Sequence, residues 1–146
     1  MGKKRVAKKG ATEKQEAGAH PAGPSQLSRK KLDTGRLFVQ ATYNSTKALL
    51  TDPEGNAVVW SSSGALGFKG ARKGTPFAAA KVGEDLGEKA RALGLREVAV
   101  VIRGVGSGRE SCIRGFIARS GALVASIEDR TPIPFNGPRP PKARRV

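Results

Sequence analysis

The stretch Val98-Ala99-Val100-Val101-Ile102-Arg103-Gly104-Val105-Gly106-Ser107-Gly108-Arg109-Glu110 decides the fold class of this chain. Its first five residues form a continuous apolar run, which is typical of a strand that is buried on both faces. The glycine-rich segment predicts a loop, and residues 109–120 predict a helix that ends at Gly121. A second apolar run at residues 123–127 predicts another strand. Because a helix connects the two strands, parallel pairing in one sheet is favoured.

A longer helix precedes this unit. Thr75-Pro76 is typical of a helix start, because threonine caps the first turn and proline suits the first helical position. Gly94 predicts the C-terminal stop. One apolar stripe lies between these ends, and it consists of Val82, Leu86, Ala90 and Leu93. Gly83 and Gly87 each cost about 1 kcal/mol relative to alanine in a helix, so we expect close packing of their backbone against the sheet.

Three short strands are predicted upstream of this helix. Residues 37–43 form a β-rich run that ends at the polar Asn44-Ser45-Thr46 turn, and residues 47–51 continue as a second strand. Asp52-Pro53-Glu54-Gly55 is a strong turn signal before a third strand at residues 57–60. We therefore predict a single α/β domain with a mixed sheet, in the order βββαβαβ, whose first three strands form an antiparallel meander.

The charge of the chain is concentrated at its two ends. Its 146 residues carry a net charge of +15, of which residues 1–31 contribute +7 and residues 130–146 contribute +5. Five prolines exclude a helix or a central strand from the C-terminal segment. We predict a basic, disordered N-terminal arm at 1–34, a globular domain at 35–129 and a basic proline-rich C-terminal arm at 130–146. Such extensions indicate a polyanionic partner, above all nucleic acid.

Composition also argues against a secreted protein and against a membrane protein. The single cysteine, Cys112, rules out an internal disulfide, and no apolar run reaches the length of a membrane span. The basic N-terminus lacks the apolar segment of a secretory signal, so the sequon at Asn44 is discounted. We expect a cytoplasmic protein without membrane contact, and import into an organelle stays open as the alternative.

Catalysis is poorly supported by the available side chains. The only histidine, His20, lies in the N-terminal arm, and one histidine with one cysteine cannot build a Cys/His metal site. The turn explains Asp52, and a capping box with Ser107 explains Glu110. We therefore predict no enzyme activity, no metal and no cofactor. A metal-dependent nuclease that uses Asp52 or Asp129 is the weakest alternative.

Two glycine-rich loops that open helices are candidate phosphate sites. Helix N-termini favour anions, and the loop at residues 64–74 adds three cations, although it lacks Walker A spacing. The loop at residues 104–109 lacks dinucleotide-binding spacing but suits a backbone phosphate of RNA. The plain alternatives are a solvated connection and a tight turn. The predicted RNA-binding set is Asn44, Lys47, Lys69, Arg72, Lys73, Ser107, Arg109, Arg114, Asn136, Arg139, Lys142, Arg144 and Arg145.

The aromatic side chains divide into two groups. Those in strands or at apolar helix positions are predicted to be core residues, and they are Phe38, Tyr43, Trp60, Phe77 and Phe116. Phe68 and Phe135 lie in loops and are better placed to pack against RNA or a partner protein.

Asn136-Gly137 has a chemical liability. Glycine does not hinder attack of its own nitrogen on the asparagine side chain, so the pair is prone to form a succinimide and then isoaspartate. That change would add a methylene to the backbone and one negative charge. The plain alternative is an Asn-Gly turn that positions the arm.

Several long motifs agree in order and spacing with those of one known family. They include Ala41-Thr42-Tyr43-Asn44-Ser45-Thr46, Thr51-Asp52-Pro53-Glu54-Gly55-Asn56, Trp60-Ser61-Ser62-Ser63-Gly64, Gly67-Phe68-Lys69-Gly70-Ala71-Arg72-Lys73, Gly106-Ser107-Gly108-Arg109-Glu110, Thr131-Pro132-Ile133-Pro134-Phe135-Asn136-Gly137 and Arg139-Pro140-Pro141-Lys142. Residues 35–146 closely resemble the universal small-subunit ribosomal protein S11 family, in its bacterial form. Phe135 and Val105 depart from the pattern, since bacterial relatives usually have His and Pro there.

The resemblance implies a structural role on the platform of the small ribosomal subunit. It implies contacts with small-subunit ribosomal RNA and neighbouring platform proteins, close to messenger RNA and the exit-site region. It also implies a ribonuclease-H-like shape without that enzyme's active site, and isoaspartate at Asn136 in some bacterial relatives. A free-standing basic nucleic-acid-binding protein is the main alternative from the residues alone.

Overall fold

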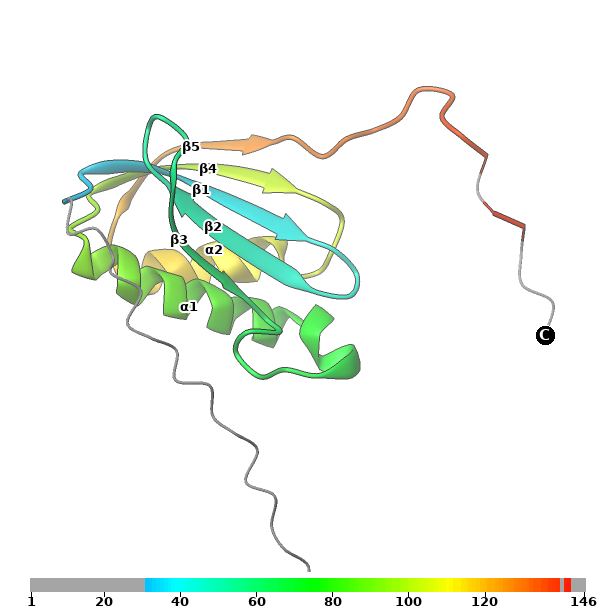
Figure 1. Cartoon of the computed structure of the whole chain (residues 1–146), viewed down its shortest axis with the longest axis horizontal. Coiled ribbons are helices and arrows are strands. Elements are labelled where there is room, and N and C mark those ends of the chain that lie inside the picture. Colours follow the sequence, from blue (N-terminus) through cyan, green and yellow to red (C-terminus); the bar gives the residue numbers. More distant parts are fainter. Residues whose placement is uncertain (1–30, 140, 143–146) are drawn as a thin grey trace, which may run out of the picture.

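The computed structural model describes residues 31–139 and 141–142 of the chain. Its five strands form one sheet in the spatial order β3-β2-β1-β4-β5 (Figure 1). The antiparallel meander consists of β1 (Thr34–Ala41), β2 (Thr46–Thr51) and β3 (Ala57–Ser62). β4 (Glu97–Arg103) pairs in parallel with β1, and β5 (Leu123–Asp129) pairs in parallel with β4.

This pairing confirms the predicted single α/β domain of ribonuclease-H-like shape, with its mixed sheet and the order βββαβαβ. The first strand is shorter at its end than predicted. β1 stops at Ala41, and the next residues form the hairpin turn, where the N–H and the hydroxyl of Thr42 both donate to the carbonyl of Ser45. One short 3₁₀ helix, η1 (Gly70–Gly74), forms within the loop predicted at residues 64–74.

Both helices lie against the same face of the sheet (Figure 1). α1 (Pro76–Ala92) and α2 (Arg109–Ser120) enclose a core with that face, and Val82, Leu86 and Ala90 of the predicted stripe are buried in it. β4 also contributes to the core, through Val98, Val100 and Ile102. The other face of β4 presents Ala99, which is half-buried, and Val101, which is buried without a helix above it.

The two glycines inside α1 face a different partner from the one predicted. A Cβ on Gly83 would lie 2.1 Å from the carbonyl oxygen of Cys112, and one on Gly87 would lie 2.8 Å from that of Phe116. Both contacts are with the backbone of α2. The prediction of close packing is thus correct, but the prediction that the sheet is the partner is wrong.

Local helix signals have mixed outcomes. Thr75 accepts a hydrogen bond from the N–H of Ala78 at 3.3 Å, which confirms the predicted start of α1. Gly94 and Gly121 take positive φ values of 82° and 68° after the two helices, as their role in helix stops requires. The prediction of a capping box between Ser107 and Glu110 is wrong. The N-cap of α2 is Gly108, and the Ser107 hydroxyl donates to the carbonyl of Gly74 at 3.0 Å.

The predicted aromatic core is wrong for four of its five members, since only Phe116 is buried in the core. Phe38 is half-buried on the sheet face opposite the helices, and Tyr43, Trp60 and Phe77 are 79%, 65% and 64% exposed. Tyr43 lies in the hairpin turn, and Trp60 points away from the helices. For Phe38 and Trp60 the error arises because alternation along a strand does not show which face the helices will cover.

Candidate nucleic-acid interface

One end of the domain collects most of the chain's loops. β1, β4 and β5 are parallel, so their carboxyl ends lie at the same edge of the sheet, where open α/β sheets commonly bind ligands. The same end holds the β1–β2 turn, the loop after β3, the N-termini of both helices and the start of the C-terminal arm (Figure 1). We call residues 42–45, 63–75, 104–108 and 130–131 the loop end.

Glycines allow these loops to pack on one another. A Cβ on Gly74 would lie 2.1 Å from the carbonyl oxygen of Tyr43, and one on Gly106 would lie 2.4 Å from that of Thr42. The N–H of Gly106 donates to the carbonyl of Ala41 at 3.0 Å. Side chains at Gly74 and Gly106 would force the loops apart, so the loop end is a fixed surface.

Three cations stand on this surface. Lys69 and Arg72 are exposed and Lys73 is half-buried, and the last two lie within η1, directly before the N-terminus of α1. Among the described residues, no carboxylate forms an ion pair with any of the three. Their charge therefore adds to the positive end of the α1 dipole, as the sequence predicted for a phosphate site.

Ser107 and Arg109 lie at the loop end, but their side chains have partners within the protein. The Ser107 hydroxyl joins the two glycine-rich loops through its hydrogen bond to Gly74. Arg109 donates to the carbonyl of Gly104 at 3.0 Å and forms an ion pair with Asp129. Both side chains thus hold the segments of the loop end together through contacts within the protein.

Asp129 fixes the start of the C-terminal arm. Its carboxylate accepts from the N–H of Thr131 at 2.9 Å and from the hydroxyl of the same residue. These bonds, together with Arg109, lower the pKa of Asp129 from 3.8 to about 2. The hydroxyl of Thr131 is also bonded to the N–H of Gly104 at 3.1 Å. The arm therefore leaves the domain from a defined point beside the second glycine-rich loop.

Beyond Thr131 the arm extends away from the domain (Figure 1). Asn136, Arg139 and Lys142 are exposed along it, and Phe135 is 97% exposed. Asn136 has a φ of 46°, the one positive value at a non-glycine residue in the described part of the chain. The predicted contacts at Arg144 and Arg145 lie outside the described residues.

The other predicted residues are spread more widely. Asn44 is exposed in the β1–β2 turn and belongs to the loop end. Lys47 stands at the start of β2 on the sheet face opposite the helices. Arg114 is exposed on α2 and pairs with Glu110 at 3.1 Å, which suits a solvated helix surface.

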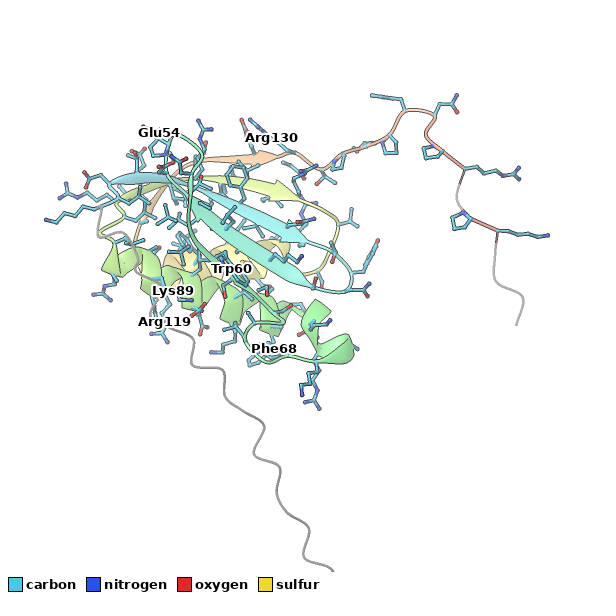
Figure 2. The ribbon with its side chains drawn as sticks, viewed as in Figure 1. Glu54, Trp60, Phe68, Lys89, Arg119 and Arg130 are labelled. Atoms are coloured by element: carbon cyan, nitrogen blue, oxygen red, sulfur yellow. The ribbon has the colours of Figure 1, made fainter. Side chains whose placement is uncertain are left out.

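Two arrangements of side chains near these positions were not predicted from the sequence, although Phe68 itself was named as a candidate for packing against RNA or a partner. Phe68 packs edge-on against Phe77, with 6.1 Å between ring centroids, and Lys81 lies 5.8 Å above the Phe77 ring (Figure 2 labels Phe68). Trp60 on β3 is exposed on the sheet face that the helices do not cover. Arg103 on β4 lies on the same face. Alternation along β3 puts Trp60 on the face opposite Val59 and Ser61, which are buried, but it does not show which of the two faces the helices cover.

The carboxylates considered for a nuclease lie at opposite ends of the sheet. Asp52 accepts from the N–H of Asn56 at 2.8 Å in the β2–β3 turn, while Asp129 ends β5 at the loop end. Within the described ranges, no three His, Cys, Asp or Glu side chains are grouped as metal ligands. Neither α1 nor α2 has the length and apolar character needed to traverse a bilayer.

Comparison with protein families identifies a match over most of the chain. The family model for ribosomal protein S11 matches residues 35–145, which is most of the chain and includes both glycine-rich loops and the C-terminal arm. Members of this family are structural proteins of the small ribosomal subunit that bind ribosomal RNA, and they are not enzymes. The chain belongs to the ribosomal protein S11 family.

Proposed function

We propose that the loop end and the C-terminal arm together bind the phosphate backbone of small-subunit ribosomal RNA. The observation that carries this proposal is the convergence of two helix N-termini, three cations without an ion pair among the described residues, and the base of a cationic arm at one end of the domain. Lysine and arginine on such a surface fix the geometry of RNA rather than read its sequence.

Within this proposal the side chains have different roles. Lys69, Arg72 and Lys73 contact phosphates directly, as do four cations of the C-terminal arm, Arg139, Lys142, Arg144 and Arg145. Asn44 and Lys47 extend the contact along the β1–β2 hairpin, and Arg114 adds a peripheral charge on α2. Ser107 and Arg109 hold the loops and the arm in the geometry that the RNA meets.

The position in the ribosome is inferred from the family resemblance. We place the protein on the platform of a bacterial-type, cytoplasmic small subunit, beside neighbouring platform proteins and close to messenger RNA at the exit-site region. Sedimentation of cell extract tests this placement, because the protein must co-migrate with small subunits at high occupancy. A map of the assembled subunit then identifies the neighbours. A protein that sediments free of ribosomes contradicts the placement.

Binding to ribosomal RNA is tested by the salt dependence of affinity. About ten phosphate contacts give a slope of log affinity against log salt of roughly −7 to −9. In K69A/R72A/K73A, three contacts are lost, and the slope should become shallower by about 2 to 3.

A matched control removes three cations from the opposite end of the domain. R91A/R96A/R119A changes the net charge by the same amount, but these residues lie at the C-terminus of α1, before β4 and in the last turn of α2. We expect the slope of this variant to stay near that of the wild type. Equal slopes for the two triple variants would show that the loop end has no special role.

We also propose that Asn136 is a site of isoaspartate formation. Its positive φ and its exposure in an Asn-Gly pair support attack by the backbone nitrogen of Gly137, because glycine carries no side chain that hinders the approach. Peptide mapping of native protein should show a fraction of residue 136 as isoaspartate. Native material that holds only unmodified asparagine contradicts this proposal.

A further inference from the structure

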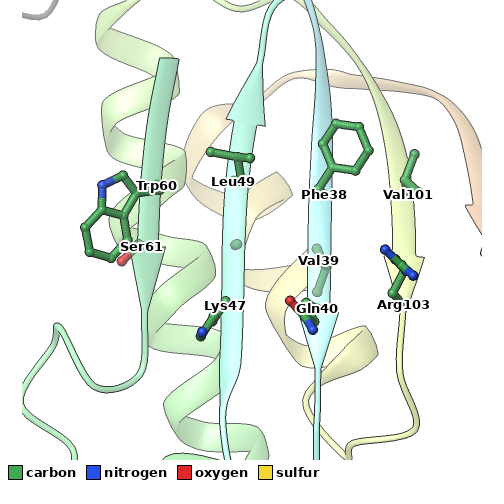
Figure 3. A pocket seen from close by; sticks show the side chains of 10 residues that line it. Phe38, Val39, Gln40, Lys47, Leu49, Trp60, Ser61, Val101 and Arg103 are labelled. Atoms are coloured by element: carbon green, nitrogen blue, oxygen red, sulfur yellow. The ribbon is translucent and has the colours of Figure 1, made fainter. Parts of the chain in front are cut away.

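The sheet face opposite the helices carries two ordered rows of side chains (Figure 3). Trp60, Leu49, Phe38 and Val101 are register partners across β3, β2, β1 and β4, so they form an apolar row. One pleat further toward the loop end, Lys47, Gln40 and Arg103 are register partners in a polar row. Residues two apart on a strand are separated by about 7 Å, which sets the distance between the rows.

This face is open in the part of the chain that the structure describes. Both helices lie on the other side of the sheet (Figure 1), and Trp60 is 65% exposed. Phe38 and Leu49 are half-buried, and a shallow groove of about 390 Å³ runs between Trp60 and Arg103 along the two rows (Figure 3). Leaving a tryptophan and a phenylalanine at such a surface costs hydrophobic burial, so an occupant that covers them is expected.

The charge of the face identifies the kind of occupant. Lys47 and Arg103 are exposed, and among the described carboxylates none forms an ion pair with either of them. The core of a protein–protein interface is depleted in lysine, whereas here Lys47 lines the groove itself. A suitable occupant has a flat apolar part that packs on the apolar row and an anionic part, about 7 Å away, that contacts the cations of the polar row.

We propose that the open face of the sheet binds an unpaired segment of ribosomal RNA, whose bases stack on Trp60 and Phe38 while its phosphates contact Lys47 and Arg103. This inference deepens the proposed function and rests on it. Stacking requires bases that are splayed out of a helix, which selects a loop, a bulge or a single strand over duplex RNA. Gln40, between the two cations, supplies both a donor and an acceptor for a base edge.

Trp60 provides its own readout, because it is the only tryptophan in the chain. The full chain is titrated with small-subunit ribosomal RNA while tryptophan emission and filter binding are recorded together. We expect quenching that saturates with binding. W60A should weaken binding by about 5- to 150-fold, the range for loss of one stacked base, and W60F should recover most of that loss. The salt slope of W60A should equal that of the wild type, since no charge is removed.

Two further variants separate this inference from the proposed function. K69A/R72A/K73A should weaken binding but leave the quenching at saturation unchanged. K47A/R103A should reduce the quenching and make the salt slope shallower by about 1 to 2. If wild-type protein shows no salt-dependent binding to the RNA, the proposed function itself fails.

The stacking proposal is overturned by RNA binding that leaves Trp60 emission unchanged at saturation. It is also overturned if W60A binds as tightly as the wild type. Quenching that occurs only when a neighbouring ribosomal protein is added to the complex would assign this face to protein docking instead. Circular dichroism of W60A and K47A/R103A checks the fold, and a folded K47A/R103A variant with normal quenching counts against the proposal even if W60A unfolds.

Discussion

Replacement of Gly83 by alanine tests the contact between the two helices. Alanine is the better helix former by about 1 kcal/mol, so helix propensity alone predicts that the variant gains stability. The packing predicts the opposite, because the new Cβ would lie 2.1 Å from the carbonyl oxygen of Cys112 and 2.8 Å from the backbone nitrogen of Phe116. Neither atom belongs to a flexible side chain that could turn away.

The size of the effect follows from the distance. Cβ atoms essentially never approach closer than 3.0 Å, so α1 and α2 would have to separate by about 0.9 Å at this point. Overpacking of a core costs about 1–3 kcal/mol and occasionally more, and a clash with helix backbone belongs at the upper end. After subtraction of the gain in helix propensity, we expect the free energy of unfolding to fall by about 2 kcal/mol or more.

Urea denaturation followed by circular dichroism measures this change. Gly64→Ala is the matched control, since a Cβ there meets no atom within 4 Å and its φ is not positive. The control should leave stability unchanged or raise it by less than about 1 kcal/mol. Gly87→Ala, with its nearest contact at 2.8 Å, should lie between the two. A Gly83→Ala variant as stable as the wild type, or more stable, would show that the helices do not meet as closely as described.

Two further predictions concern titratable groups. The pKa of Asp129 is lowered to about 2 by Thr131 and Arg109, so the contribution of this carboxylate to stability is fully present above about pH 4 and is lost as the pH falls through 2. The carboxyl chemical shift of Asp129 should therefore titrate near pH 2, and this midpoint should move toward 3.8 in Arg109→Ala. An unshifted titration in the wild type would contradict the anchored arm. Burial raises the pKa of the Cys112 thiol to about 12, so alkylation at pH 8 should be at least about 1000-fold slower than for an exposed thiol; equal rates for native and urea-unfolded protein would contradict this packing.

Local signals in the sequence were sufficient for the order of the strands and of the two α-helices, and for the start of α1 and the end of α2. Thr75-Pro76 starts α1 and Gly121 ends α2, because caps and left-handed glycines act within a few residues of where they stand. The parallel pairing also followed, since a strand–helix–strand connection leaves few alternatives. The candidate cations at residues 69–73 could be placed beside a helix N-terminus for the same reason.

What could not be predicted depends on contacts between distant segments. The Ser107 hydroxyl is bonded to Gly74, 33 residues away, instead of capping its own helix. Gly83 and Gly87 allow close contact with α2 rather than with the sheet, and Trp60 is exposed because both helices pack against the other face of the sheet. No periodicity within a single segment contains this information.

The central position of β1 has a consequence for synthesis of the chain. β1 is made before every other strand, yet its parallel partner begins 63 residues later, where Thr34 pairs with Glu97. A nascent chain can close the meander early, but one edge of β1 must wait for α1 and β4 to emerge. Long-range parallel pairing is slow to form and exposes unpaired strand edges meanwhile. The edge of β1 that pairs with β4 is therefore an unpaired, aggregation-prone strand edge until residues 97–103 have been made.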